Sequence, residues 1–337
     1  MIATLTPAFA LPFLGPTLAL SLVAVAGVRK YLQHQLLDIP NERSSHTRPT
    51  PRGGGLGFII AFAIAFPIVW LVAPALTVGV PPLIWLALVP LIAIGIIDDW
   101  RSVSSGLRYL VQLSVATVIV YACGAFPLPG LSPLGMPGVW LATGLTVIGV
   151  TALINFYNFM DGLDGLVAGV SALQLTFLAI WSQQPVLWLW VVALLGFLYW
   201  NWSPAKIFMG DAGSTTLGAV VSIALLSQPH LTTGTAWTSL AILLPLVGDA
   251  IYTLVSRLLR GDNIFQAHRF HLYQRLHQAG WSHGQVAGSY VGVSAVIAIG
   301  LMQLGAIAAW MSLVGMVLGV AIAETHLSSP KTPNANN

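Results

Sequence analysis

Eight of the ten acidic residues in this 337-residue chain are aspartates, and five of these stand where long apolar segments begin or end. They form three groups: Asp98 with Asp99, Asp161 with Asp164, and Asp211 alone. Carboxylates at the edge of an apolar region are costly unless they are paired or bind a cation, and five converging ones would repel each other. Such hard oxygen ligands favour Mg2+, or alternatively Mn2+, and therefore chemistry on phosphate groups. The simpler alternative is that each aspartate is a solvated loop residue that balances a nearby arginine.

Amide and hydroxyl groups accompany these aspartates. Asn155, Asn158 and Asp161, with Asp164 as a further member, follow one another at intervals of three residues, a spacing that places them along one stripe of a helical or 3₁₀ turn. On such a stripe the amides could read a base or a ribose while the aspartate approaches a metal ion. Asp211 and Ser214 precede an apolar segment, so we expect them near a helix N-terminus, where backbone N–H groups and the helix dipole favour phosphate. Taken singly, both residues would be ordinary helix caps.

Two polar segments supply basic residues and histidines. Residues 43–55 contain arginines, hydroxyls and three consecutive glycines, which suit a phosphate that lies close to the backbone. The same residues could instead be a basic anchor at the inner face of a membrane. Residues 257–285 contain His268 and His271, but no third soft ligand for zinc is evident. Their imidazole and guanidinium groups are better suited to hydrogen bonds with a diphosphate or a sugar.

The elements that carry these residues are expected to be membrane helices. Charged residues make up 7% of the chain and hydrophobic residues 56%, whereas a soluble domain carries ~25% charged residues. The apolar runs are continuous and do not alternate with period two, which excludes barrel strands and predicts an all-α polytopic membrane protein. Eleven runs approach the length that a bilayer requires. They are residues 8–28, 56–76, 83–97, 110–126, 139–154, 166–181, 186–200, 215–228, 237–256, 286–303 and 305–322.

If each of these runs crosses the membrane once, the connecting loops lie alternately on its two faces. Five loops and the segment from residue 323 fall on one face, the loops being 29–55, 98–109, 155–165, 201–214 and 257–285. All 13 lysines and arginines lie on this face, and the connections on the other face carry no charged residue. By the positive-inside rule the charged face is cytoplasmic, with the N-terminus outside and the C-terminus inside. We therefore expect one transmembrane domain over residues 1–337 whose cytoplasmic loops form the active site.

The same composition argues against several classes of protein. Cys123 is the single cysteine, which rules out an intrachain disulfide and a cysteine-based metal cluster. The basic residues are too few and too scattered to follow a nucleic-acid backbone, although the net charge is +3. A transporter or flippase for a phosphorylated substrate stays open as an alternative, since many helices with buried acids also describe transporters. Against it, the charges gather at one face and no internal repeat is visible.

Together the motifs resemble the polyprenyl-phosphate N-acetylhexosamine-1-phosphate transferases, the bacterial glycosyltransferase family 4. The matching segments, in the order of the family, are Arg43 to Gly55, Asp98-Asp99, Asn155 to Gly165, Phe208 to Ser214 and Arg257 to Leu276. The likeness is greater to the branch that initiates O-antigen or related envelope glycans than to the peptidoglycan pentapeptide translocase. Tyr273-Gln274 stand where many GlcNAc-using members have a His-His pair, which leaves the sugar open between GlcNAc, FucNAc and QuiNAc.

The resemblance implies a role for each motif. Asp98 and Asp99 would be the catalytic pair, and Asp211 the leading Mg2+ ligand. The residues at the nucleotide would be Asn155, Asn158, Asp161, Asp164 and Thr50. Those at the diphosphate and sugar would be Arg257, His268, Arg269 and His271. Those at the lipid phosphate would be Arg43, Ser44, His46 and Arg52.

The resemblance also implies a reaction. The enzyme would transfer N-acetylhexosamine 1-phosphate from a UDP-N-acetyl-sugar to undecaprenyl phosphate and release UMP, as the first membrane step of O-antigen or related polysaccharide synthesis. Its partners would be these substrates, the lipid bilayer of the bacterial inner membrane and, as a further option, a second copy in a homodimer. A phosphate monoester has a second pKa near ~6, so the acceptor is already mostly ionised at neutral pH. We therefore expect Asp98 or Asp99 to position the acceptor rather than deprotonate it, although a covalent aspartyl-phosphate intermediate stays open.

Overall fold

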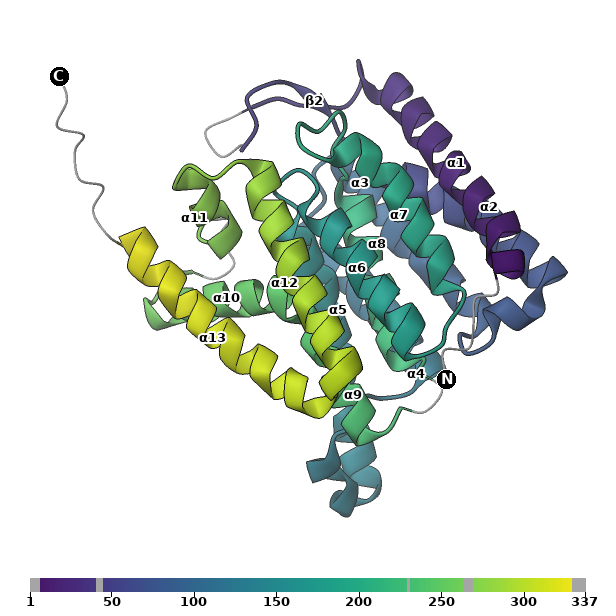
Figure 1. The fold of residues 1–337 in the computed structure, drawn as a ribbon, viewed down its shortest axis with the longest axis vertical. Helices are drawn as coiled ribbons and strands as arrows, with labels where there is room; N and C mark the ends of the chain where they lie inside the picture. The colour runs from purple at the N-terminus through teal and green to yellow at the C-terminus, as the bar shows by residue number, and fades with distance from the viewer. Residues whose placement is uncertain (1–6, 41–44, 229–230, 264–268, 329–337) are drawn as a thin grey trace.

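The computed structural model describes residues 7–40, 45–228, 231–263 and 269–328, and this part of the chain is almost entirely helical (Figure 1). Eight of its helical spans are long and apolar enough to cross a membrane. They are α1 (Pro7–Leu32), α2 (Gly55–Val72), η2–α3 (Pro82–Trp100), α4 (Ser105–Cys123), α5 (Met136–Met160), α9–α10 (Thr233–Leu259), α12 (His283–Leu304) and α13 (Ala306–Ser328). Three shorter apolar helices are α6 (Leu166–Trp181), α7 (Leu187–Asn201) and α8 (Asp211–Leu226). These segments lie where the apolar runs predict helices, so the expected multi-pass helical architecture is confirmed; their orientation in the membrane stays a prediction.

Helix α8 is the buried centre of one end of this bundle. Every residue of α8 after Asp211 is buried, and α8 packs against α5, α3, α6 and α2. Two close approaches fix its first turn: a Cβ atom on Gly55 would lie 2.5 Å from the Cα of Gly213, and one on Gly95 would lie 2.4 Å from the Cα of Ala212. The backbones of α2 and α3 therefore touch the N-terminus of α8, and only glycine permits this contact.

Several of the loops expected on the charged face are partly helical. Helix α3 continues to Trp100, so Asp98 and Asp99 lie in its last turn, and α5 continues to Met160, so Asn155 and Asn158 are helical too. The first loop contains an antiparallel pair of two-residue strands, β1 (Leu37–Asp38) and β2 (Thr50–Pro51). Hydropathy alone places a span's end where polar residues begin, whereas the backbone keeps its helical hydrogen bonds beyond the apolar region.

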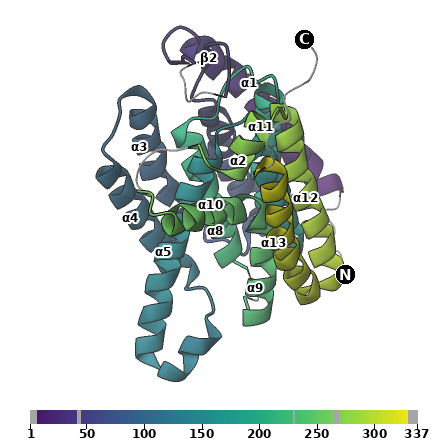
Figure 2. The same ribbon diagram turned by 90° about the vertical axis from the view of Figure 1, so that its left-hand side faces the viewer.

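The ninth span is broken, which the apolar run over 237–256 does not predict. It consists of α9 (Thr233–Leu240), a 3₁₀ turn (Ala241–Leu243), a π-helical turn (Leu244–Gly248) and α10 (Asp249–Leu259). Pro245 lies inside the π turn and lacks the N–H that an α-helix would require there. Figure 2 shows the outcome, with α10 running across the bundle instead of continuing the direction of α9.

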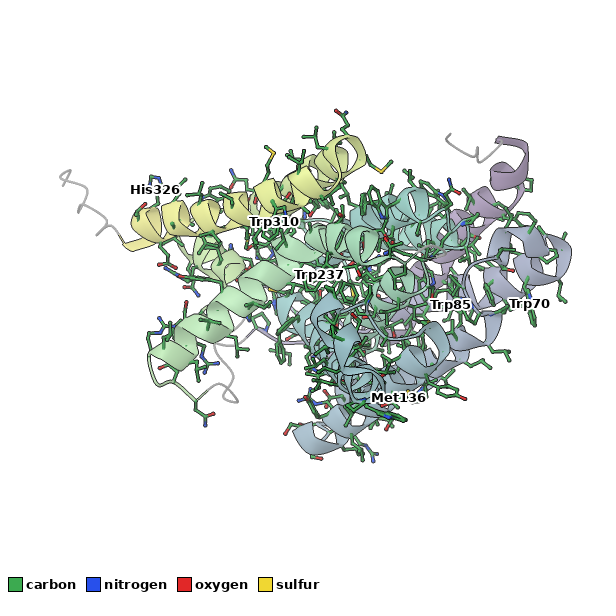
Figure 3. The ribbon with its side chains drawn as sticks, turned by 90° about the horizontal axis from the view of Figure 1, so that it is seen from below. Trp70, Trp85, Met136, Trp237, Trp310 and His326 are labelled. Atoms are coloured by element: carbon green, nitrogen blue, oxygen red, sulfur yellow. The ribbon has the colours of Figure 1, made fainter. Side chains whose placement is uncertain are left out.

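Outside the bundle's core, large apolar side chains face outwards. The exposed fractions of Trp70, Trp237 and Trp310 are 41%, 49% and 70%, and Figure 3 shows Trp70 towards one edge of the molecule and Trp310 on α13. Trp85, by contrast, is buried. An apolar exterior of this extent is stable in lipid and unstable in water, so the chain is a multi-pass membrane protein. The remaining ordered elements are short: η1 (Pro74–Thr77), η3 (Pro129–Leu134) and α11 (Leu272–Gln278).

Candidate active site

Three of the predicted aspartates meet at the N-terminus of α8, where two arginines join them; we call this group the carboxylate cluster. Arg52 contacts Asp99 through Nε at 2.8 Å and Asp211 through a terminal nitrogen. Arg108 contacts Asp98 at 2.8 Å and Asp211 at 3.6 Å. The cluster thus joins residues from the segment before α2, the end of α3, the first turn of α4 and the start of α8.

Local backbone geometry holds the carboxylates in place. The Asp98 carboxylate accepts a hydrogen bond of 2.7 Å from the N–H of Val103, which closes the turn between α3 and α4. The Asp99 carboxylate accepts one of 3.1 Å from the N–H of Asp211. Gly210, at φ +80°, turns the chain into α8, and a Cβ atom there would lie 2.6 Å from Asp99 Oδ2. The left-handed conformation and the contact both require glycine.

A polar pocket of about 370 Å³ borders the carboxylate cluster. Arg52 and Asp211 line one side of it, and Asn158, Asp161 and Asp164 line another. Asn158 donates a hydrogen bond of 3.0 Å to the hydroxyl of Ser214. The structure therefore brings the predicted nucleotide residues Asn158, Asp161 and Asp164 next to the predicted metal ligand. They do not share one helical stripe, because α5 ends at Met160. The predicted lipid-phosphate residues His46 and Arg52 also line this pocket.

The residues that line the pocket include more acidic than basic side chains. Burial raises the pKa of Asp161 to about 7, and the charges of Asp211 and Asp99 act in the same direction, while Arg52 lowers it. Burial by itself would lower the pKa of the Arg52 guanidinium, but Asp211 and Asp99 raise it above its ordinary value. Arg52 is therefore a permanent cation. Arg52 and Arg108 together face more carboxylates than they can neutralise, and the excess negative charge would be offset by a further cation.

The carboxylates match a divalent ion by their chemistry. Asp211 would hold Mg2+ with Asp98 and Asp99 beside it, because hard carboxylate oxygens are the ligands that Mg2+ prefers. In the described residues no three His, Cys, Asp or Glu side chains are gathered closely enough to form a metal site as they stand. Arg52 and Arg108 supply the positive charge between the carboxylates instead. The donor types fit the ion, and its binding would require these arginines to shift.

His283, at the start of α12, was not predicted as a site residue. Its Nδ1 lies 3.1 Å from Asp164 Oδ1 and its Nε2 lies 2.9 Å from the carbonyl oxygen of Ser45. Burial by itself would raise the pKa of Asp164, but hydrogen bonds from His283 and from the N–H of Ala205 hold the pKa below its ordinary value. His283 thereby ties three separate polar segments together at the wall of the pocket. No sequence signal identifies it, since it stands alone among polar residues.

Two further predicted residues lie elsewhere: His271 lies beside the buried carboxylate of Asp249, and Arg257 lies near Asp262. The carboxylate accepts hydrogen bonds from the N–H groups of Leu272 (2.8 Å) and Tyr273 (3.1 Å). His271 Nδ1 lies 3.6 Å from Asp249 Oδ1, and Arg257, on α10, donates to the carbonyl oxygen of Asn263. Neither Arg257 nor His271 is among the residues that line the polar pocket.

Other predicted residues also lie outside the pocket lining. The Asn155 amide donates 2.7 Å to Gln112 Oε1 on α4, and buried Thr50 donates 3.1 Å to the carbonyl oxygen of Arg48. Arg269 is half-buried and does not line the pocket. Three predicted residues, Arg43, Ser44 and His268, lie outside the described residues.

Comparison with known proteins identifies the family of the chain. Residues 82–228 match the family model for glycosyl transferase family 4, a segment that contains all three carboxylates of the cluster. A probable undecaprenyl-phosphate N-acetylglucosaminyl 1-phosphate transferase of Bacillus subtilis is 31% identical over 82% of this chain and 79% of its own length. The chain belongs to glycosyl transferase family 4. The family resemblance drawn from the motifs is thereby confirmed.

Two further relatives show the range of this family. A decaprenyl-phosphate N-acetylglucosaminephosphotransferase of Mycobacterium leprae is 30% identical over 82% of this chain and 79% of its own length. A phospho-N-acetylmuramoyl-pentapeptide-transferase of a Synechococcus strain is 30% identical over 88% of this chain and 92% of its own length. The chain is accordingly a membrane-embedded transferase of glycosyl transferase family 4. Its similarity extends to relatives named for pentapeptide transfer as well as to those named for N-acetylglucosamine transfer.

Proposed function

We propose that this family 4 transferase moves N-acetylhexosamine 1-phosphate from a UDP-N-acetylhexosamine to undecaprenyl phosphate, forming undecaprenyl-diphosphate-sugar and UMP. The carboxylate cluster carries the proposal: Asp98, Asp99 and Asp211 meet two arginines at one end of an apolar bundle. A prenyl chain stays in lipid because water disfavours it, so its phosphate meets a soluble nucleotide sugar only at the membrane edge. A site at the end of the bundle, not at its midplane, favours transfer over transport.

The side chains of the cluster have separate roles in this reaction. Asp98 and Asp99 position the lipid phosphate, whose oxygen attacks the sugar-bearing phosphorus while UMP leaves. Arg52 and Arg108 bind phosphate oxygens, since guanidinium groups form charge-assisted hydrogen bonds with them. Asp211 holds Mg2+, which supplies charge neutralisation at the diphosphate. Asn158, Asp161 and Asp164 bind the nucleotide in the polar pocket that they line.

We further propose a place in the cell for this reaction. The charged face is cytoplasmic by the positive-inside rule, which puts the site on the side where nucleotide sugars are made, at the bacterial inner membrane. The product would enter O-antigen or related cell-envelope polysaccharide synthesis. The named relatives act on N-acetylglucosamine or on a muramoyl pentapeptide, so an N-acetylhexosamine is the class of sugar that they support.

The decisive experiment measures UMP release by purified protein. The assay contains Mg2+, undecaprenyl phosphate and one UDP-sugar at a time: UDP-GlcNAc, UDP-FucNAc, UDP-QuiNAc or UDP-MurNAc-pentapeptide. We expect UMP with at least one of the first three, and loss of about 10²- to 10³-fold in Asp211→Asn, the scale of a lost transition-state charge partner. Glu324→Gln, a change in α13 away from the cluster, is the matched control. Absence of UMP with every sugar would overturn the proposal.

The role of the catalytic pair is tested by pH. If Asp98 and Asp99 position the acceptor, Asp98→Asn and Asp99→Asn lower kcat at every pH, because the phosphate is ionised above its second pKa near ~6. If either aspartate removes a proton instead, the corresponding variant recovers towards full activity as alkaline pH replaces the base. The measurement is kcat from pH 6 to pH 9.5 for both variants and the unmodified enzyme. Recovery in the alkaline range would refute the positioning role.

A further inference from the structure

Two basic side chains meet on one aromatic ring, apart from the carboxylate cluster and the polar pocket. Arg29 lies in the last turn of α1, and its guanidinium carbon is 5.4 Å from the centre of the Trp200 ring. Lys206 follows α7, and its ammonium nitrogen is 5.3 Å from the centre of the same ring and 5.4 Å from that of Tyr199. Neither basic residue lines the polar pocket. We call Arg29, Tyr199, Trp200 and Lys206 the cationic patch.

Trp200 fixes the patch between α1 and α7. Its indole N–H donates a hydrogen bond of 3.2 Å to the carbonyl oxygen of Leu22, on α1. Its own carbonyl oxygen accepts one of 2.8 Å from the N–H of Lys206, which folds the segment after α7 back towards the ring. The two helices pack against each other, and Figure 1 shows their last turns at the end of the molecule where β2 lies. Because both long side chains already lie against a ring, they lose little further freedom when an anion binds.

The positive charge of the patch is not balanced by a carboxylate. Within residues 7–40, 45–228, 231–263 and 269–328, no aspartate or glutamate forms an ion pair with Arg29 or Lys206. Arg52 and Arg275, by contrast, each contact a carboxylate. The cationic patch therefore retains net positive charge that an anion from outside the chain can neutralise.

Next to these cations, the outer face of α7 is apolar. Leu195 lies one turn before Tyr199 on the same side of the helix, and their exposed fractions are 46% and 64%. Trp202, just after α7, is also exposed. Exposed tyrosine and tryptophan side chains are typical of the boundary between hydrocarbon and water, because one end of each ring is apolar and the other polar. We therefore expect the patch to lie at the level of the lipid headgroups, with an apolar surface beside it.

We propose that the cationic patch binds an anionic phospholipid, such as phosphatidylglycerol, with Arg29 and Lys206 at its headgroup phosphate and its acyl chains along α7. Guanidinium and ammonium groups donate charge-assisted hydrogen bonds to phosphate oxygens. The apolar face of α7 selects an anion that carries hydrocarbon chains, because a soluble anion would leave that face without a partner. The inference does not depend on the proposed transferase reaction, whose carboxylate cluster shares no residue with the patch.

Five variants separate binding at the patch from a general attraction of positive charge. Arg29→Gln and Lys206→Gln, singly and together, each remove a charge while keeping a long side chain. Arg29→Lys and Lys206→Arg keep the charge. Arg260→Gln is the matched control, because Arg260 is an exposed cation outside the patch that lies 3.5 Å from Asp262. Its loss changes the net charge by the same amount as the loss of Arg29.

The experiment titrates the purified full-length protein in neutral detergent with phosphatidylglycerol and follows bound lipid by native mass spectrometry. We expect saturable binding whose Kd rises about fivefold in Arg29→Gln and in Lys206→Gln, the factor that one basic residue contributes near an anionic lipid surface. The Kd rises further in the double variant. The charge-preserving variants and Arg260→Gln bind as the unmodified protein does, and the Tm of each variant confirms its folding. Phosphatidylcholine, whose headgroup is zwitterionic, binds more weakly and without distinction between the variants.

Three outcomes would overturn the proposal about the patch. The first is a double variant that binds phosphatidylglycerol as tightly as the unmodified protein; if the double variant does not fold, the single variants decide by the same criterion. The second is displacement of phosphatidylglycerol by an equal concentration of inorganic phosphate, which would make the patch a site for a soluble anion. The third is weaker binding of undecaprenyl phosphate with phosphatidylglycerol binding intact, which would assign the patch to the acceptor. None of these measurements uses UMP release, so the two proposals fail separately.

Discussion

The aspartates of the carboxylate cluster lie at helix ends of opposite polarity. Asp98 and Asp99 end α3, where the helix dipole disfavours negative charge, whereas Asp211 begins α8, where the dipole favours it. Arg52 and Arg108 offset the unfavourable pair. Carboxylates at a helix C-terminus are a cost to folding that stability alone does not explain, which supports the proposal that the cluster is the functional site.

The free energy of unfolding is expected to depend on pH through the protonation of Asp161. Its pKa is about 7 in the folded protein and 3.8 when unperturbed, so the folded state binds more protons between these values and loses stability as pH rises through them. Without divalent ions, Asp161→Asn therefore becomes more stable than the unmodified protein as pH rises, by at most about 1.4 kcal/mol per pH unit, with no further gain well above pH 7. Denaturant unfolding in detergent from pH 4.5 to pH 8.5 measures this.

Asp164→Asn is an internal control, because the pKa of Asp164 is shifted in the direction opposite to that of Asp161. The pKa of Asp164 is lowered by His283 and a backbone N–H, so its contribution is present above its ordinary pKa and is lost on acidification. This variant is expected to be less stable than the unmodified protein at pH 8 and to stay so down to about pH 4, because the difference is lost only as the pH falls below the ordinary pKa of 3.8. An Asp161→Asn curve parallel to that of the unmodified protein between pH 4.5 and pH 7 would contradict the assignment for Asp161, and an Asp164→Asn protein as stable as the unmodified protein at pH 8 would contradict that for Asp164.

Among the elements, one short and buried helix is the centre of the site. Helix α8 is too short to be a typical span, yet it is almost wholly buried and its N-terminus is the meeting point of α2 and α3. The sequence predicts each helix from its apolar run because hydropathy is a local property. It does not predict which helices are central, because that depends on contacts between residues far apart in the chain.

The glycine contact between α2 and α8 is expected to control both stability and activity. In Gly55→Ala the added methyl group would meet the backbone of Gly213, which cannot move aside as a side chain can. We expect a loss of about 1–3 kcal/mol, the usual cost of overpacking, and reduced UMP release because Asp211 is two residues from the contact. Gly106→Ala on α4, where an added Cβ has open space, should leave Tm and kcat unchanged. A Gly55→Ala protein with normal Tm would refute the close approach.

Asp249 stabilises the broken ninth span through hydrogen bonds. Its buried carboxylate accepts hydrogen bonds from two backbone N–H groups and from the hydroxyls of Tyr290 (2.7 Å) and Thr253 (3.1 Å). Asp249→Ala leaves these donors without an acceptor, so we expect the free energy of unfolding to fall by about 3 kcal/mol or more. Tyr290→Phe removes one hydrogen bond and should cost about 1 kcal/mol. Denaturant unfolding compares the two; equal losses would show that Asp249 does not anchor α11.

At the scale of the whole molecule, the site occupies one end of an apolar bundle. The helix ends that carry Asp98, Asp211 and His283 gather at one end of the bundle, whereas the η3 turn and α9 lie at the other (Figure 1). All lysines and arginines fall in loops on the site's side in the predicted threading. Separation of this kind suits an enzyme that draws one substrate from the lipid and the other from the cytoplasm.

The orientation of the bundle is a prediction that cysteine labelling can test. In a Cys123→Ser background, Gly106→Cys lies on the predicted cytoplasmic face and Gly234→Cys on the opposite face, and both positions are exposed. A membrane-impermeant maleimide applied to intact spheroplasts should label Gly234→Cys and spare Gly106→Cys, whereas both react after permeabilisation. The reverse pattern would invert the topology and remove the argument for a cytoplasmic site.

The sequence by itself determined that the protein lies in lipid and is helical, roughly where each span lies, and to which family the chain belongs. It could do so because apolar runs and motif residues are local in the chain. It also indicated that Asn158, Asp161 and Asp164 lie together, since they are close in the chain, but the predicted helical stripe was wrong: α5 ends at Met160 and Asn155 contacts Gln112 instead of the pocket. Tertiary structure decided which distant segments meet: that Arg52 and Arg108 bridge the aspartates, that His283 holds Asp164, and that the 237–256 span bends at Pro245. It also decided that Arg29 and Lys206 meet at Trp200. These features arise from packing between helices, and a hydropathy pattern contains no information about such contacts.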